Sequence, residues 1–419
     1  MHQDSEGRSS RRSFIASLGA MSALAVWPPG HLHAGQLQRG QQVSQRGLAA
    51  DANDFLFAPE LIYLQTGSLG PTPRPVMEKT IATWRELELN PVYYGYGPHE
   101  QAMEATRANA AAFIGCTTNE LVLTRSTTEG MNWVAQGLGL ASGDRVLTTD
   151  QEHPGGRACW DYVARKFGVA IDVVVIPPGE NDALAILDRV ASQLTSRTRV
   201  LSISHVLSST GLRMPVAELS ALARARGALS VVDGAQAVGG IVVDVKALGC
   251  DIYATSGHKW LLAPKGTGFL YLNAAIGQAV DPIALQGGRA AYSNSSGVTS
   301  LPSVLGLSAS IDYVRAIGIG AVERHNLMLR NRLYDAMREV PTIRVVSAPA
   351  GPLASPLLTY VLPDSIPSRE FMQRLSDRHH VVVKTVPAQW LNGNRISTHL
   401  FNTEQDVDAL VVALRRELA

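Results

Sequence analysis

Residues 251–272 read DIYATSGHKWLLAPKGTGFLYL and hold two lysines among apolar and aromatic side chains. Lysine is almost never fully buried unless its amine is paired or used chemically. Lys265 stands between Pro264 and Gly266 at a turn before an expected strand, so we expect its amine to be solvated. Lys259 follows the end of an expected apolar strand, so its amine needs a partner or a chemical role.

The strand expected just before this stretch also ends in a charged residue. Residues 230–240, SVVDGAQAVGG, place Asp233 at the end of an apolar run, followed by small residues that leave room for a flat ligand. A buried carboxylate is costly unless it meets a cation. One interpretation is a buried salt bridge with Lys259 at a sheet end. The other is a pyridoxal phosphate site, in which the lysine bonds to the aldehyde and the acid holds the proton of the ring nitrogen.

Apolar runs alternate with helix-period segments through the middle of the chain, which predicts an α/β domain with a mainly parallel sheet. The expected strands are residues 121–124, 145–148, 171–176, 199–203, 230–233, 252–255 and 266–272. Polar residues gather at the ends of these runs, where an open α/β sheet binds its ligands.

The pattern changes after a long helical segment, expected at residues 304–317 and 322–339. Short strands follow at residues 343–346, 357–361, 381–383 and 396–400, and a helix at residues 404–418 has Thr403 as its candidate N-cap. We therefore predict a large domain at residues 60–300 and a smaller C-terminal α+β domain at residues 301–419.

Composition excludes several classes of function. Of 419 residues, 46% are hydrophobic and 17% charged, which is typical of a globular protein with a large core. The formal charge of +1, without a basic stripe, argues against nucleic-acid binding. The three cysteines lack the spacing of a zinc site or a disulfide framework, so we expect neither.

The N-terminus has the features of a targeting segment. Residues 9–26 read SSRRSFIASLGAMSALAV, with the pair Arg11 and Arg12 before an apolar run too short for the roughly 20 residues of a membrane span. This resembles a twin-arginine export signal, although a frayed tail with a chance arginine pair is the alternative. We expect a cleaved signal at residues 1–34, a linker at residues 35–59, and export by the twin-arginine machinery to the periplasm or beyond the cell, with no membrane span in the mature protein.

Several motifs in one order resemble the class V aminotransferases, which are pyridoxal phosphate enzymes of fold type I. The motifs are DGAQA at residues 233–237, SGHKW at residues 256–260 and KGTGFLYL at residues 265–272. The resemblance runs in register from residues 63–76 to residues 395–407, and it is closest to the proteins that resemble isopenicillin N epimerase and cysteine desulfurase. It implies a seven-stranded, mainly parallel sheet in the large domain, a pyridoxal 5'-phosphate cofactor and a homodimer.

The resemblance assigns roles around the ring of the cofactor. Lys259 would form the internal aldimine, Asp233 would pair with the pyridine nitrogen, and Gln236 would bind the ring hydroxyl. His153, in TTDQEHPGG, would stack on the pyridine face. Ser208, in SHVLSSTGLRMP, stands where cysteine desulfurases commonly carry an asparagine.

The remaining cofactor residues would hold the phosphate. Thr127 and Thr128 lie in TRSTTEGMNWVAQGL, before a helix expected to begin near residue 129, and a helix N-terminus supplies free N–H donors. Ser256 and His258 would add donors beside the lysine. Thr299, in SSGVTSLPS, would reach the phosphate of the neighbouring subunit.

The residues near the C-terminus bear on the reaction. Arg395, in RIS, would bind the substrate carboxylate, because a guanidinium can pair with it bidentately. Cysteine desulfurases carry a nucleophilic cysteine shortly before this arginine, and residues 384–397, KTVPAQWLNGNRIS, contain none. We therefore expect chemistry at the α-carbon of an amino-acid-like substrate, as in an epimerase or aminotransferase similar to isopenicillin N epimerase. The alternatives are β-elimination by a C–S lyase or a cysteine desulfurase-like enzyme and, more remotely, a non-catalytic binding protein.

Overall fold

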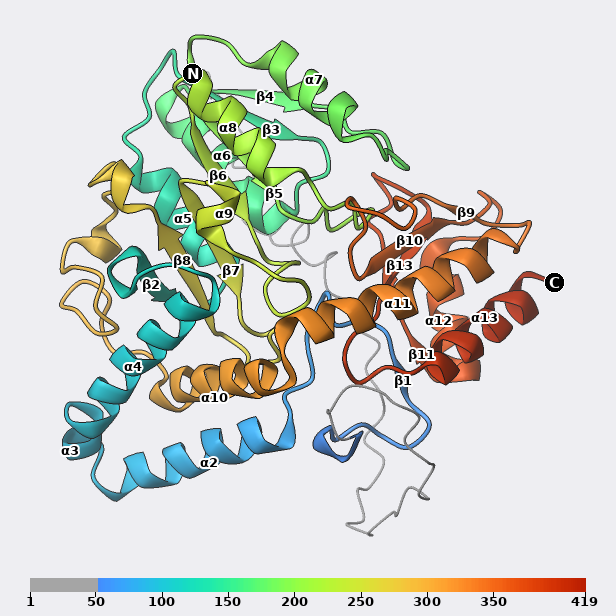
Figure 1. Cartoon of the computed structure of the whole chain (residues 1–419), viewed down its shortest axis with the longest axis horizontal. Coiled ribbons are helices and arrows are strands. Elements are labelled where there is room, and N and C mark those ends of the chain that lie inside the picture. The colour runs from blue at the N-terminus through green and yellow to red at the C-terminus, as the bar shows by residue number, and fades with distance from the viewer. Residues whose placement is uncertain (1–51) are drawn as a thin grey trace, which may run out of the picture. The chain divides into compact units, whose positions relative to one another are not determined.

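The computed structural model describes residues 52–419, which belong to one compact unit. Its centre is a seven-stranded sheet in the order β2-β8-β7-β6-β5-β3-β4 (Figure 1). The strands are β2 (Leu121–Thr124), β3 (Arg145–Thr149), β4 (Ala170–Val174), β5 (Thr198–Ser204), β6 (Leu229–Asp233), β7 (Ile252–Ser256) and β8 (Gly268–Leu272). Only β8 runs against its neighbours, so the expected mainly parallel sheet is confirmed.

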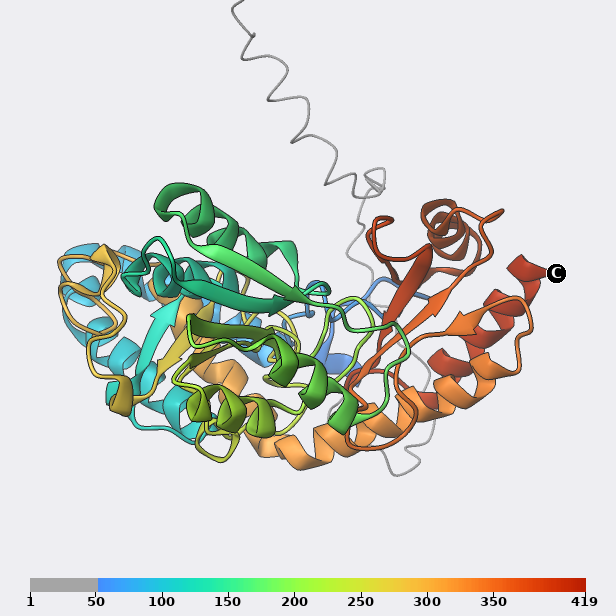
Figure 2. The same ribbon diagram turned by 90° about the horizontal axis from the view of Figure 1, so that it is seen from above.

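Both faces of this sheet are buried, which is why its strands read as continuous apolar runs. Val231 belongs to a core cluster on one face and Val232 to a cluster on the other. The covering helices are α5 (Thr127–Gly137), α6 (Pro154–Phe167), α7 (Ala183–Gln193), α8 (Val216–Ala225) and the short α9 (Val245–Leu248). Figure 2 shows helices on both sides of the sheet.

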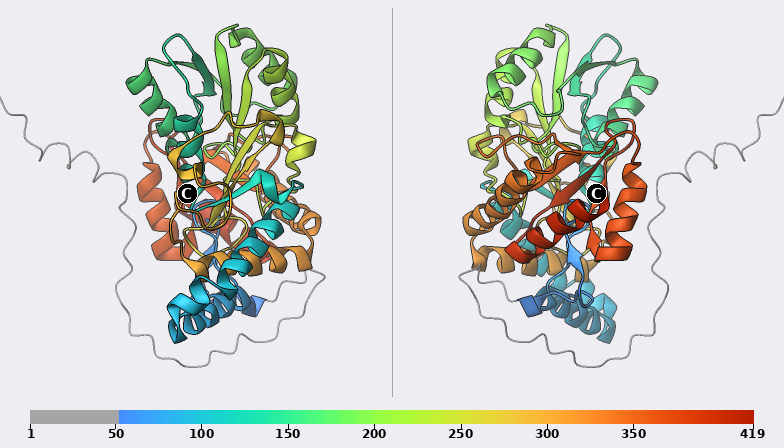
Figure 3. Two further views of the ribbon diagram at one scale, coloured as in Figure 1. Left: turned by 90° about the vertical axis from the view of Figure 1, so that its left-hand side faces the viewer. Right: turned by 90° about the vertical axis from the view of Figure 1, so that its right-hand side faces the viewer.

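The C-terminal part is built on a separate antiparallel sheet, seen from its own side in the right-hand view of Figure 3. Its strands follow the order β12-β13-β10-β9, with bounds β9 (Arg344–Val345), β10 (Leu357–Val361), β12 (Lys384–Thr385) and β13 (Gly393–Ser397). The helices are α12 (Ser368–His379) and α13 (Glu404–Leu418), and the Thr403 side chain caps α13 as expected by accepting from the backbone N–H of Asp406.

Two expected strands of this part differ in the structure. The run expected at residues 396–400 is β13, which begins three residues earlier because its ladder with β10 starts at Gly393. The run expected at residues 381–383 is β11 (Val381–Val382), and it pairs in parallel with β1 (Ile62–Tyr63) instead of joining the other strands. The domain boundary at residue 300 stays a prediction, and the twin-arginine segment lies outside the described residues.

The remaining helices lie at the periphery of the large sheet or against the C-terminal sheet. They are α2 (Arg74–Leu89), α3 (Pro91–Gly95), α4 (Pro98–Phe113), α10 (Leu301–Ile317) and α11 (Ile319–Arg338), with one-turn helices η2 (Ala52–Asp54), η3 (Thr118–Glu120), η4 (Ala274–Ile276) and η5 (Ile283–Leu285). Within residues 52–419, no single helix is long and apolar enough to cross a membrane, and α10 and α11 reach that threshold only together, across a 74° bend.

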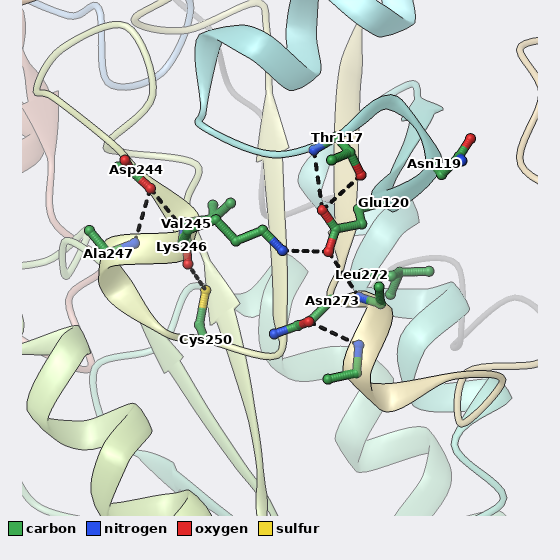
Figure 4. A network of polar contacts seen from close by, with 12 residues as sticks. Thr117, Asn119, Glu120, Asp244, Val245, Lys246, Ala247, Cys250, Leu272 and Asn273 are labelled. Atoms are coloured by element: carbon green, nitrogen blue, oxygen red, sulfur yellow. Dashed lines mark hydrogen bonds and ion pairs between the residues drawn. The ribbon is translucent and has the colours of Figure 1, made fainter.

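A polar network secures the antiparallel edge of the large sheet (Figure 4). Glu120, which precedes β2 and is 3% exposed, accepts hydrogen bonds from Lys246 of α9, from the backbone N–H of Ala274, and from Thr117. Burial alone would raise the pKa of Glu120, but these donors outweigh it and lower the pKa to about 2. The network therefore joins the starts of β2 and α9 to the end of β8.

We predict that Glu120→Gln lowers the free energy of unfolding by about 2 kcal/mol at pH 7, because Lys246 loses its charged acceptor. Since the pKa of Glu120 is lowered by folding, its contribution is present above the unfolded pKa of about 4.3 and is lost as pH falls towards 2. The difference between variant and wild type should therefore narrow between pH 5 and pH 2 in urea denaturation. Glu339→Gln, at a side chain that is 74% exposed, is the control, and a difference independent of pH would contradict the assignment.

Candidate active site

Three neighbouring parallel strands deliver the candidate catalytic residues to one edge of the large sheet. Asp233 ends β6, Ser256 ends β7 and Ser204 ends β5, and Asp233 is the direct register partner of Ser204. Lys259 follows three residues after β7. The carboxyl edge of a parallel sheet is where open α/β folds bind ligands, and the strand order brings Asp233 and the loop that carries Lys259 to this edge.

The amine of Lys259 has the properties of a nucleophile. The side chain is half-buried, and burial lowers the pKa of Lys259 to about 8. The positive charges of Arg395 and Lys384 lower it further, while Asp233 opposes the shift. The neutral amine, which is the form that attacks a carbonyl, is therefore more populated at neutral pH than in an ordinary lysine.

Asp233 is buried without an ion-pair partner. Among the ion pairs of residues 52–419, none within 4.0 Å joins Asp233 to Lys259, so the alternative of a structural salt bridge is not realised. Its Oδ1 accepts the backbone N–H of Ala235 at 2.9 Å, and burial raises its pKa against the effect of the Lys259 charge. Such a carboxylate suits a cationic ligand atom.

The expected phosphate residues lie at the start of α5. The helix begins at Thr127, two residues earlier than the sequence suggested, with the side chain of Ser126 as its N-cap. Thr127 donates its backbone N–H to Ser256 Oγ at 2.9 Å, whereas the side chain of Thr128 is exposed. The Nδ1 atom of His258 is buried and has no hydrogen-bond partner among the described residues. These groups fit an anionic ligand with several acceptor oxygens.

Arg395 is a second buried charge without an acidic partner in the described chain. It is 5% exposed, and its guanidinium donates to the Ser208 carbonyl at 2.7 Å and to Ser68 Oγ at 3.3 Å. Its Nε atom has no partner, and burial lowers the pKa of Arg395 to about 10. Ser208 is therefore brought next to Arg395, and it contacts Arg395 by its backbone carbonyl.

Gln236 is held by partners that the sequence did not indicate. Its Nε2 donates to the Gly67 carbonyl and its Oε1 accepts from the Trp260 indole, each at 2.8 Å. One N–H of the amide remains for a ligand, so the proposed bond to a ring hydroxyl stays a prediction. In the sequence, the tryptophan directly after Lys259 could have indicated a partner for Gln236.

His153 caps α6 through Nδ1, which accepts the Gly155 N–H at 3.0 Å. Part of the His153 side chain is exposed to solvent. Burial of the rest, followed by the positive charges of Lys259 and Arg395, lowers the pKa of His153 to about 4. The imidazole is therefore neutral at pH 7, as stacking on a pyridinium ring requires.

Thr299 borders a cavity near the start of α5. It lines a cavity of about 320 Å³ together with Arg125, Glu129 and Thr267, and neither Lys259 nor Asp233 contributes to that lining. The contact of Thr299 with the phosphate of the neighbouring subunit stays a prediction.

Sequence reasoning missed Glu152, the residue before His153. Glu152 is 8% exposed and accepts hydrogen bonds from the hydroxyls of Ser204 at 2.6 Å and Thr149 at 2.7 Å. Burial raises the pKa of Glu152 to about 7, and the nearby charge of Asp233 adds to the rise. Its position after an expected strand and next to His153 could have indicated that Glu152 lies at the site.

Comparisons with known proteins agree with this geometry. The family model described as aminotransferase class-V matches residues 62–410. The chain belongs to the class V aminotransferase family. Its relatives include isopenicillin N epimerase of Streptomyces clavuligerus, 30% identical over 86% of this chain and 96% of that protein, and a cysteine desulfurase of Salmonella choleraesuis, 30% identical over 85% and 93%.

A solved structure similar to this one is a C-DES mutant with glycine covalently linked to its PLP cofactor. It covers 87% of this chain and 99% of its own, at a TM-score of 0.78 and 24% identity. The likeness confirms fold type I. As a class V aminotransferase, the chain is an enzyme that uses pyridoxal phosphate, and the unpaired Asp233, the unpartnered His258 Nδ1 and the amine of Lys259 fit that cofactor.

Gly156 permits α6 to approach the cofactor acid. A Cβ at this helical position would lie 2.7 Å from Asp233 Oδ2. We predict that Gly156→Ala weakens pyridoxal phosphate binding at least tenfold, measured by titration of the apoenzyme. Gly320→Ala in α11, whose Cβ would meet only the end of Arg324 at 3.5 Å, should bind normally. Equal affinity of both variants would contradict a cofactor role for Asp233.

Proposed function

We propose that this enzyme acts at the α-carbon of an amino-acid-like substrate, as an epimerase or aminotransferase similar to isopenicillin N epimerase. The observation that carries the proposal is the buried Arg395, whose guanidinium has an unpartnered Nε and no carboxylate partner within residues 52–419. Burying a guanidinium without an anion is costly, and the α-carboxylate of a substrate would relieve that cost.

Different side chains of the protein can bind the substrate, transfer its proton and hold the cofactor ring. Bound pyridoxal phosphate withdraws electrons from the α-carbon of an attached amino acid, which acidifies its α-proton. Arg395 would hold the α-carboxylate and so fix the orientation of the substrate. Lys259, with its pKa lowered to about 8, can accept the α-proton in its neutral form and return a proton afterwards. Asp233 would hold the proton on the ring nitrogen.

The cysteines support this choice over a persulfide mechanism. Burial raises the pKa of Cys116, Cys159 and Cys250 to about 12 in each case. The thiolate is the nucleophilic form, so none of the three is poised for attack near neutral pH. Residues 384–397, which precede and include Arg395, contain no cysteine.

The test is to incubate the holoenzyme with a panel of amino acids in deuterated water and to follow the products by NMR. We expect α-deuterium exchange with inversion or with formation of a keto acid. Arg395→Lys should lower kcat/KM about 10- to 100-fold, because it loses bidentate pairing, and Lys166→Met on α6 is the control. Release of pyruvate and ammonia from cysteine or cystine, with loss of the β-sulfur group in place of inversion or transamination, would establish the β-elimination alternative instead.

We also propose a homodimer, because apolar side chains gather at one surface. Leu89 and Val92 are 76% and 71% exposed, and Val92 lines a cavity of about 240 Å³ with Tyr96, Val298 and Thr299. Exposed apolar clusters of this kind are typical of interfaces, and a second copy here would place Thr299 at the border between subunits. In sedimentation analysis, Leu89→Lys combined with Val92→Lys should shift the dimer to a monomer. A monomeric wild type would contradict the proposal.

Export in a folded state is proposed from the residues around Arg11 and Arg12, since a protein that takes up its cofactor in the cytoplasm has reason to cross a membrane already folded. Replacing both arginines by lysine should leave the precursor inside the cell. Unchanged export of that variant would exclude the twin-arginine route.

A further inference from the structure

Lys384 is the direct cross-strand neighbour of Arg395. The two residues are register partners in the antiparallel ladder between β12 and β13. Opposed residues of such a ladder point to the same face of the sheet, with Cβ atoms about 5 Å apart. The side chain of Lys384 therefore leaves the sheet on the same side as the guanidinium of Arg395.

Neither cation has an acidic partner in the part of the chain that the structure describes. The ion pairs within residues 52–419 include neither Lys384 nor Arg395, although both kinds of side chain form such pairs elsewhere. The pKa of Lys384 is lowered by burial and by the positive charge of Arg395, with no carboxylate opposing. Like charges directly opposite one another destabilise a ladder, so this arrangement is costly unless an anion is bound.

The two cations lie at different depths. Arg395 is 5% exposed, whereas Lys384 is exposed to solvent. The charge of Lys384 also acts on Lys259 and on His153, which places it at the same site. Within residues 52–419, Asp233 is the carboxylate that acts on Lys259, and the cofactor ring would engage it. The outer part of the site therefore has a surplus positive charge directed at incoming ligands.

We propose that Lys384 forms a second anion subsite, and that the substrate is an amino acid with an acidic group on its side chain. This rests on the proposed function, in which Arg395 takes the α-carboxylate. Because Arg395 is deeply buried and Lys384 is at the rim, one carboxylate at each cation suits a dicarboxylate better than one carboxylate shared by both. The residues expected to hold the phosphate of the cofactor lie elsewhere, at the start of α5 and at the end of β7.

Binding of a pair of matched ligands tests the subsite without turnover. Glutarate and its monoamide, glutaramate, have the same length and each offers one carboxylate to Arg395, so they differ only in the charge of the second group. By calorimetry on the holoenzyme, glutarate should bind at least tenfold more tightly than glutaramate. Lys384→Met should abolish this preference by weakening glutarate much more than glutaramate while cofactor content stays unchanged, and Lys166→Met, which removes another solvent-exposed lysine charge, should retain the preference.

Three results would overturn the inference. Equal affinity of the wild type for both ligands would exclude a second anion subsite. If Lys384→Met weakened the binding of glutarate and glutaramate equally, Lys384 would bind the same carboxylate as Arg395. If the variant lost bound pyridoxal phosphate, Lys384 would bind the phosphate of the cofactor. Failure of the proposed function would give a different result. The enzyme would then show no α-deuterium exchange with amino acids but would still bind glutarate more tightly than glutaramate.

Discussion

A carboxylate buried at the end of a central strand is the constraint on which the site depends. Asp233 lies in low-dielectric surroundings without an ion pair within the described chain, supported by one backbone N–H. Such a group is unfavourable in isolation, and it becomes favourable when a protonated ring nitrogen is bound. The register of β5, β6 and β7 fixes its position, and Gly156 leaves the space that its second oxygen occupies.

The loop that carries Lys259 is held from three distant parts of the chain. The backbone N–H of Gly70 donates to the His258 carbonyl at 2.8 Å, and a Cβ at position 70 would lie 2.0 Å from the Lys259 carbonyl oxygen. Trp260 donates its indole N–H to Gln236, and its carbonyl is 2.7 Å from His399 Nε2. An amine that must react at one position needs such a rigid support, and packing alone would not fix it.

Much of the fold could be predicted from the sequence because its determinants are local. The seven strands of the large sheet are apolar runs bounded by turn residues. The capping pattern at Thr403 likewise predicts the start of α13. Pairings between distant short segments have no local signal, which is why the association of β1 with β11 was not foreseen.

The same distinction applies to the site. Lys259 and Asp233 could be identified because charged residues at the ends of apolar strands are conspicuous, and the resemblance to a family added Arg395. The contacts of Gln236 with Gly67 and of Arg395 with Ser68 join residues 169 and 327 positions apart. Lys384 was missed because its significance comes from its register partner and not from its neighbours in the sequence.

We propose that Lys259 is the residue that bonds to pyridoxal phosphate. Reducing the purified holoenzyme with borohydride, digesting it and mapping the peptides by mass spectrometry tests this directly. We expect the cofactor mass on the peptide that contains Lys259, and on that residue rather than on Lys265. Attachment to Lys265, or to no lysine at all, would contradict it.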